Sequence, residues 1–249
     1  MTQVEHRSRP GEQRRAGDAS RRPYRRAQWI GVGLLVALAL ALVVALVQAM
    51  GDDAPASSGS ASGTAVAPAD LEHGVPVGEA DAPVTVVLYF DYLCPACGAF
   101  EHANGEELTR LLGEETIRLE LRPMAFLDDL SDGTRYSTRA ANAMATVADA
   151  APDRVWAFHR ALYAAQPAED GPGLTDEELA ELAVGAGVPQ EVVDRFADAT
   201  YEPWTADMTQ RAFDDGVEGT PTILIAGRVF DGDPYTTGPL TEAIEQARG

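Results

Sequence analysis

The chain of 249 residues contains two cysteines, and both lie in one short box, Cys94-Pro95-Ala96-Cys97. The box comes soon after Val84–Phe90, an apolar and β-branched run that predicts a strand buried on both faces. Two cysteines cannot form a disulfide framework, and a structural zinc site needs four ligands. A pair with this spacing can bond to itself and exchange that bond with another protein. The box therefore predicts thiol–disulfide chemistry.

The N-terminal part of the chain predicts a membrane anchor. Residues 29–50 are almost wholly apolar, and no charged residue occurs in the 25 positions between Arg26 and Asp52. A helix needs roughly 20 apolar residues to cross a bilayer, whereas the apolar part of a cleaved signal peptide has roughly 7–15. Residues 1–28 hold eight arginines and three acidic residues, so the positive-inside rule places this end in the cytoplasm and the rest outside. We expect a single-pass cell-membrane protein; the alternative is a signal cleaved within the small-residue stretch Ala65–Ala69.

The segment that follows the anchor predicts a tether. Residues 51–70 are rich in Ala, Ser, Gly and Pro and have no hydrophobic period. A flexible coil of this length spans on the order of 25 Å, which would keep the outer domain close to the membrane. The net charge of the whole chain is −20 although its first 28 residues are basic. The outer part is therefore strongly acidic, which excludes nucleic acid as a partner and favours solubility.

Residues 71–249 are long enough for one domain with a substantial core. Apolar periodicity and turn residues predict a strand, a helix and a strand at its beginning, and two short strands and a helix at its end. These elements are expected at Val84–Phe90, 94–112, 116–121, 222–226, 228–230 and from Thr237 onward.

A long helical block separates these two groups of elements. It covers about residues 131–215 and includes a capping box, Thr175–Glu178, that opens one of its helices. Pro189 is expected to open another. A βαβ unit followed by ββα is the thioredoxin plan. The order of elements therefore predicts an α/β thioredoxin fold with the helical block inserted in its middle.

The position of Cys94 at the start of a predicted helix indicates a reactive thiol. Free backbone N–H groups and the positive end of the helix dipole favour thiolate over thiol there. We expect Cys94 to be the exposed nucleophile and Cys97, one turn further, to be the resolving thiol. The alternatives are a buried, inert pair and a weak metal site.

A second motif, Gly219-Thr220-Pro221-Thr222, lies far along the chain at the head of a predicted strand. Proline cannot donate to a strand ladder, and X-Pro bonds in tight turns are where cis peptides occur. If Thr220–Pro221 is cis and packs opposite Cys94, the Thr220 backbone can pair with an extended substrate. The alternative is an ordinary trans proline.

Four stretches carry a family resemblance across nearly the whole outer domain: Ala82–Val87, Asp91–Cys97, Leu121–Leu127 and Gly216–Thr222. In their order and spacing the chain resembles DsbA-type members of the thioredoxin superfamily, specifically membrane-anchored bacterial thioredoxin-domain proteins. The resemblance implies a thioredoxin fold with a helical insertion and a cis Pro221 beside the cysteines. It also implies transfer of disulfides to or from exported proteins, with Pro95, Ala96 and Thr220 supporting the cysteine pair.

Two positions depart from the family pattern. Many oxidoreductases of this fold have a buried acid six positions before the first cysteine, where this chain has Leu88, and the strong oxidases have His where it has Ala96. The acidic residues that remain as proton acceptors are Asp91, Glu101 and Glu120, and we expect all three to be solvated. The direction of electron flow therefore stays open.

Two histidines are further candidates for a base. His102 lies eight residues after Cys94, about two helical turns on, so we expect it at the surface. His159 falls on an apolar helical face, and we expect it to be a satisfied core residue.

The combined interpretation is a membrane-tethered, extracytoplasmic thiol:disulfide oxidoreductase. Oxidation of exported proteins is favoured because disulfides persist outside the cytosol, and a membrane redox partner would recycle the pair. The alternatives are a reductase or isomerase fed by a membrane electron donor, and a non-catalytic peptide-binding or holdase module. We expect no cofactor and no metal, and a monomer, because the tether is too short and polar to be a dimerisation region.

Overall fold

The computed structural model describes residues 71–249. The predicted cytoplasmic tail (1–28), membrane helix (29–50) and tether (51–70) lie outside these residues. Between Leu71 and Gly249, no helix is both long enough and apolar enough to cross a membrane.

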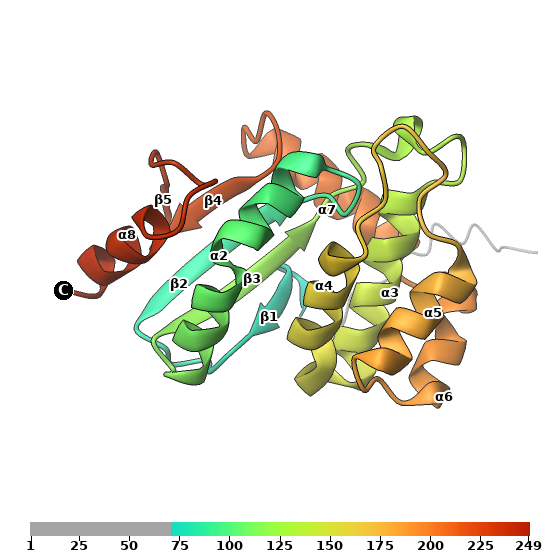
Figure 1. The fold of residues 1–249 in the computed structure, drawn as a ribbon, viewed down its shortest axis with the longest axis horizontal. Coiled ribbons are helices and arrows are strands. Elements are labelled where there is room, and N and C mark those ends of the chain that lie inside the picture. The colour runs from blue at the N-terminus through green and yellow to red at the C-terminus, as the bar shows by residue number, and fades with distance from the viewer. Residues whose placement is uncertain (1–70) are drawn as a thin grey trace, which may run out of the picture. The chain divides into compact units, whose positions relative to one another are not determined.

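A five-stranded sheet forms the centre of the domain (Figure 1). Its strands are β1 (Val75–Val77), β2 (Val84–Phe90), β3 (Ile117–Pro123), β4 (Thr222–Ile225) and β5 (Arg228–Val229), in the spatial order β1-β3-β2-β4-β5. Strands β2 and β3 are parallel, and the other three pairs are antiparallel. The thioredoxin plan predicted from the sequence is confirmed, with β1 as an additional edge strand that the sequence did not predict.

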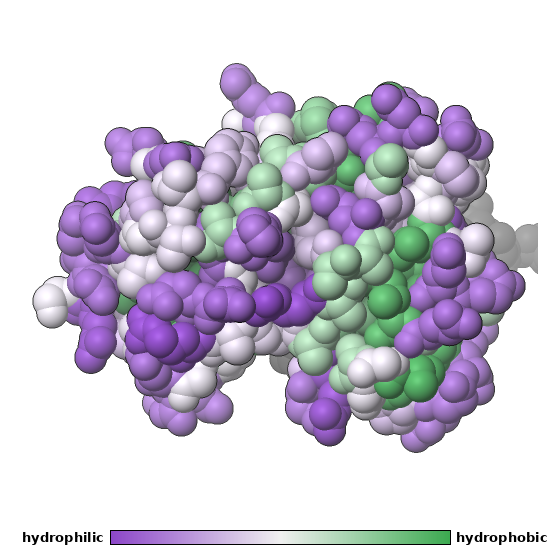
Figure 2. All heavy atoms as spheres, in the orientation of Figure 1, coloured by the Kyte–Doolittle hydropathy of each residue, from purple (hydrophilic) through white to green (hydrophobic). Residues whose placement is uncertain are grey.

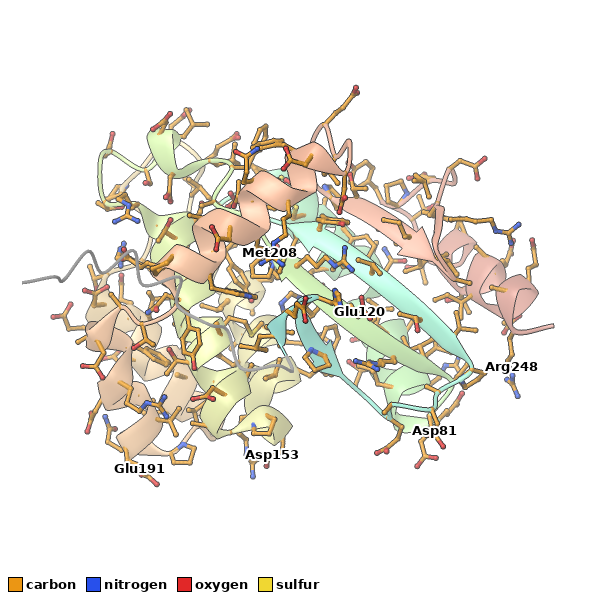
Figure 3. All side chains as sticks on the ribbon, turned by 180° about the vertical axis from the view of Figure 1, so that it is seen from behind. Asp81, Glu120, Asp153, Glu191, Met208 and Arg248 are labelled. Atoms are coloured by element: carbon orange, nitrogen blue, oxygen red, sulfur yellow. The ribbon has the colours of Figure 1, made fainter. Side chains whose placement is uncertain are left out.

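Helices cover both faces of the sheet. Helices α2 and α8 lie on the face seen in Figure 1, and α7 crosses the opposite face in Figure 3, where Met208 is buried on its inner side. Helices α3 to α6 form the block beside the sheet. The helix bounds are α2 Pro95–Gly113, α3 Tyr136–Ala150, α4 Val155–Ala164, α5 Asp176–Gly185, α6 Gln190–Val193, α7 Glu202–Asp214 and α8 Pro239–Arg248, with 3₁₀ turns at Asp128–Leu130, Pro152–Arg154 and Asp194–Asp198.

The central strand β2 is buried on both faces, as its apolar sequence predicts. Val86, Leu88 and Phe90 point into the main core, whereas Val87 and Tyr89 join a second, smaller cluster beneath α7. Because side chains alternate along a strand, one uninterrupted apolar run fills both cores. Strand β2 is thereby held rigidly, and the cysteine box begins four residues after its end.

The helical block agrees with the sequence in outline. The capping box is present: Glu178 N–H donates to Thr175 Oγ1 at 3.2 Å, and Thr175 N–H donates to a Glu178 carboxylate oxygen at 2.8 Å. The helix expected from Pro189 is shorter than predicted, because α6 ends at Val193 and continues as a 3₁₀ turn. Trp204 of α7 donates to the Leu71 carbonyl at 3.0 Å and so ties α7 to the start of the domain.

Polar residues cover most of the face drawn in Figure 2, and an apolar strip lies over the helical block. A shallow groove between α4 and α5 belongs to this strip; its lining includes Ala157, Ala161, Leu182 and Ala186. Neither cysteine lines this groove.

Candidate active site

Cys94 is the N-cap residue of α2, and Pro95 is the first residue of the helix. A tight turn follows β2, in which Cys94 N–H donates to the Asp91 carbonyl at 3.1 Å. The first N–H groups of a helix have no partner within it, and those of Ala96 and Cys97 serve the Cys94 sulfur instead. Cys94 is 7% exposed, so little of the residue reaches solvent.

The two cysteines have opposite acidities. The pKa of Cys94 is lowered from 9.0 to about 6, chiefly by a hydrogen bond from the Cys97 side chain, which outweighs the effect of burial. Cys97 is fully buried, and burial raises its pKa well above 9.0. At neutral pH the reduced pair therefore holds a thiolate at Cys94 and a thiol at Cys97, the arrangement that a nucleophile and a resolving thiol require.

The distant Thr220–Pro221 motif lies against Cys94. The Thr220–Pro221 peptide bond is cis, and the Cys94 sulfur lies 3.4 Å from the Thr220 carbonyl oxygen, to which Cys94 donates in its protonated form. This approach follows from the pairing of β2 with β4, where Tyr89 lies opposite Thr222. The Thr220 hydroxyl is buried and makes no hydrogen bond to another described residue. Its proton is free to turn toward sulfur, and the hydroxyl lowers the pKa of both cysteines.

Asp91 corrects one expectation, because it is fully buried and not solvated. Its carboxylate accepts hydrogen bonds from Leu93 N–H (2.8 Å), Leu127 N–H (2.9 Å) and the Ser137 hydroxyl (2.6 Å). Burial nevertheless raises its pKa to about 6, and the nearby Cys94 charge adds to that rise. The three donors come from separate segments of the chain. By binding all of them, the Asp91 carboxylate holds the turn before the cysteines in place.

Glu101 corrects a second expectation, since it is 6% exposed and belongs to a buried chain of hydrogen bonds. Its Oε1 lies 2.9 Å from His159 Nε2, and His159 Nδ1 lies 3.1 Å from the Tyr92 hydroxyl. Burial raises the pKa of Tyr92 well above 10, so that hydroxyl remains protonated and donates to Nδ1. The Nε2 proton then faces Glu101. The expectation of a satisfied core histidine at position 159 is confirmed.

The remaining acid and histidine have no part in the cysteine site. Glu120 is half-buried and pairs with Arg122 at 3.0 Å, so the expectation of a solvated carboxylate holds only in part. Leu88 is buried in the main core, where the family pattern has an acid. His102 is exposed, as expected.

The end of α4 contributes two residues that the sequence did not reveal. The Tyr163 hydroxyl donates to the Asp91 carbonyl at 3.1 Å. The Gln166 side-chain amide donates to the carbonyls of Tyr92 (3.1 Å) and Cys94 (2.9 Å). No local pattern around these residues marks them, because their partners are backbone groups more than 70 positions away.

Comparisons with known proteins agree with the thioredoxin plan of the fold. A family model described as "Thioredoxin" matches residues 70–246, which include both cysteines and the Thr220–Pro221 motif. The serine/threonine-protein kinase PknE of Mycobacterium tuberculosis is 34% identical over 121 residues, which are 47% of this chain. The match covers 21% of the kinase, so this chain spans about a fifth of that relative's length. The disulfide bond formation protein D of Bacillus subtilis is 29% identical over 163 residues, 63% of this chain and 70% of that protein.

Solved structures with the same fold include disulfide oxidoreductases. The reduced form of DsbG from Mycobacterium tuberculosis superposes with a TM-score of 0.62 at 30% identity, covering 70% of this chain and 87% of that one. Reduced DsbA from the same organism superposes with a TM-score of 0.62 at 29% identity, covering 71% of this chain and 93% of that one.

Proposed function

This chain belongs to the DsbA-type branch of the thioredoxin superfamily, and on that premise we propose that it is a protein thiol:disulfide oxidoreductase acting on exported proteins. The observation that carries the proposal is the asymmetric pair: a Cys94 sulfur at a helix N-terminus with its pKa lowered to about 6, and a buried Cys97 with a raised pKa. The likeness to protein D of Bacillus subtilis supports the same chemistry.

The reaction begins from the Cys94–Cys97 disulfide. A substrate thiolate attacks the Cys94 sulfur, a substrate–Cys94 bond forms, and the Cys94–Cys97 bond breaks with its electron pair leaving on Cys97. Cys97 takes up a proton, because its pKa lies well above neutral pH. A second substrate thiolate then attacks the substrate sulfur and displaces Cys94 as a thiolate. The substrate is oxidised to its disulfide and the cysteine pair is reduced by two electrons.

The low pKa of Cys94 supports oxidation as the direction. A stabilised thiolate is a good leaving group, and stabilising the reduced form makes the disulfide a stronger oxidant. A reductase or isomerase is the competing candidate because Ala96 replaces the histidine of strong oxidases. Equilibration with glutathione distinguishes these: DsbA-like potentials lie near ~−120 mV and thioredoxin-like potentials near ~−270 mV. A potential near the lower value would overturn oxidation.

An extended substrate segment is the form that this site accommodates. A groove beside the cysteine site is lined by Tyr89, Thr220, Pro221, Leu224 and Val229, among others. The edge strand β5 borders it, and Val229 on that strand is 68% exposed. Backbone groups at a sheet edge bind peptides irrespective of their side chains, which suits an enzyme with many substrates.

The location completes the proposal. Residues 29–50 anchor the chain in the cell membrane, residues 51–70 form the tether, and the domain acts outside the cytoplasm as a monomer. A membrane redox partner reoxidises the pair. Alkylation of thiols in intact cells tests this arrangement: mostly disulfide at Cys94 and Cys97 supports an oxidant, whereas mostly dithiol identifies a reductant.

A trapping experiment tests the activity itself. The full-length Cys97→Ala variant lacks the resolving thiol, so its Cys94 thiolate should attack a disulfide of an oxidised, unfolded substrate protein, displace one substrate thiolate and accumulate as a mixed disulfide with the other substrate sulfur. The matched Cys94→Ala variant should accumulate none, and neither variant should oxidise the same protein supplied in its reduced form. A non-catalytic binding module would instead bind the substrate equally well with both cysteines replaced.

A further inference from the structure

We propose that Gln166 is a positioning residue that holds the cysteine turn in its reactive orientation, and that Gly98 is required in α2 to leave room for it. The inference rests on the proposed function and adds a residue outside the cysteine box and the proline motif. Gln166 lies just beyond α4, in the inserted helical block, and neither its position nor its neighbours in the sequence mark it as functional.

Both hydrogen bonds that the Gln166 side-chain nitrogen donates go to the turn. A glutamine NH₂ group has two donors, and here the nitrogen lies 3.1 Å from the Tyr92 carbonyl and 2.9 Å from the Cys94 carbonyl. Within residues 71–249, the Tyr92 carbonyl has no other hydrogen-bond partner. The same turn is held from the next position on the helix face by Tyr163, which donates to the Asp91 carbonyl.

The Cys94 carbonyl is the group through which this contact acts on the sulfur. Rotation about the Cα–C bond of Cys94 moves its carbonyl relative to its side chain, and the observed ψ is 115°. Holding the carbonyl oxygen therefore fixes the direction of the Cα–Cβ bond that carries the sulfur. In that direction the sulfur meets the N–H groups of Ala96 and Cys97. The Gly98 N–H also donates to this carbonyl, at 3.2 Å. Loss of the amide would therefore remove one of the carbonyl's two hydrogen bonds, and we expect the loosened turn to spend less time in the orientation in which those donors face the sulfur.

Gly98 provides the second, independent observation. A Cβ at this position would lie 2.0 Å from Gln166 Oε1 and 3.0 Å from its Cδ. The amide is the far end of a flexible side chain, so it could swing away from such a Cβ at little steric cost. It would then leave both carbonyls. Glycine is unfavourable inside a helix compared with alanine, and the close approach of Gln166 accounts for its presence one residue after Cys97.

The test measures how fast iodoacetamide alkylates Cys94 across pH 4–9 in the reduced, full-length chain. The variants are Gln166→Met, which keeps length but removes both donors, Gly98→Ala, and the double variant. Gln190→Met, at an exposed site on α6, and Gly113→Ala, where a Cβ would meet nothing within 4 Å, are the matched controls. The urea midpoint of each variant separates unfolding from a local effect.

In the wild type we expect the titration midpoint near pH 6. Both single variants should raise it by about half a unit or more, which is roughly a threefold loss of thiolate at low pH. The double variant should match Gln166→Met alone, because alanine at position 98 has nothing left to displace. The controls should match the wild type.

Three results would overturn the inference: unchanged midpoints in both single variants, effects that add in the double variant, or an effect of Gly113→Ala equal to that of Gly98→Ala. If Gln166→Met does not fold, Gly98→Ala still decides the question, because it retains the glutamine and displaces only its amide. A wild-type midpoint near that of a free cysteine would overturn the proposed function as well, so the two failures are distinguishable.

Discussion

The Cys94 sulfur lies 3.4 Å from the carbonyl oxygen of Thr220, although the two residues are 126 positions apart in the sequence. The antiparallel pairing of β2 and β4 brings them together, since each motif adjoins an end of one of these strands. The βαβ unit supplies the cysteines, and the ββα unit supplies Thr220 and Pro221. The surroundings of the Cys94 sulfur are therefore complete only when both units are folded together.

Removal of the Thr220 hydroxyl should make Cys94 less acidic. Thr220→Val keeps the β-branched shape but removes a donor that lowers the pKa of Cys94, so we expect that pKa to rise from about 6 toward 9.0. The pH dependence of alkylation measures the change. Thr222→Val is the matched control, because the Thr222 hydroxyl donates to the Gly219 carbonyl at 2.7 Å and not to sulfur. An unchanged midpoint in Thr220→Val would show that the hydroxyl does not serve the thiolate.

The donor at position 97 should account for most of the acidity of Cys94. Its side-chain hydrogen bond is the largest cause of the lowered pKa. Cys97→Ala should therefore raise the pKa of Cys94 more than Cys97→Ser does, because serine keeps a hydroxyl donor at the same place. Alkylation of Cys94 across pH measures both. Equal midpoints in the two variants would assign the effect to the helix N-terminus instead.

Asp91 should make the domain less stable as the pH rises. Its pKa is about 6 in the folded protein and 3.8 in the reference state, so the folded protein holds the proton more tightly. The associated stability is complete below pH 3.8 and is lost as the pH rises to about 6. From pH 4 to pH 7 this loss is roughly 2 kcal/mol in the free energy of unfolding.

Urea unfolding of the reduced chain at pH 4 and pH 7 measures this loss. Asp91→Asn should reduce the difference between the two pH values by that amount, whatever its effect on stability at either pH. Asp129→Asn, which removes an exposed carboxylate nearby, should retain the wild-type difference. A wild-type difference in Asp91→Asn would contradict the burial effect.

The chain of hydrogen bonds through His159 should be a major support of the core. His159→Leu leaves the buried Glu101 carboxyl and Tyr92 hydroxyl without their partner, so we expect the free energy of unfolding to fall by on the order of 3 kcal/mol. Replacing Glu101 with Met in the same variant should restore part of that loss, because no polar group is then left unpaired on α2.

The control for this prediction is the exposed histidine. His102→Leu should change the free energy of unfolding by less than about 0.5 kcal/mol. If the double variant Glu101→Met/His159→Leu were less stable than His159→Leu alone, the Glu101 carboxyl would have another partner.

The sequence predicts those parts of the fold in which local pattern and packing agree. The apolar run of β2, the helix after Cys94 and the capping box at Thr175 all form as predicted. The reason is that each signal, whether continuous burial, a first-turn proline or a reciprocal cap, is satisfied within a few residues. Strand β1 has three residues with Pro76 at its centre, so it depends on its partner β3 and leaves no pattern of its own.

The sequence interpretation was wrong about two acidic residues, Asp91 and Glu101, which it predicted to be solvated and which are buried. Asp91 and Glu101 are polar residues that normally stay in water, and each becomes buried because distant groups bind it: Ser137 and Leu127 at one, His159 at the other. A single sequence contains no sign of such partners. The same is true of Gln166, which donates to backbone carbonyls. Every residue has a backbone carbonyl, so the sequence around these partners gives no sign of the contact.

The small exposed fraction of Cys94 has a consequence for when this protein acts. Cys94 as a residue is 7% exposed, so we expect a cysteine fixed in the surface of a folded protein to approach its sulfur with difficulty. A cysteine on an unfolded polypeptide meets no such obstacle. We therefore expect substrate proteins to exchange disulfides with Cys94 while they are still unfolded. Once they have folded, we expect the exchange to become much slower.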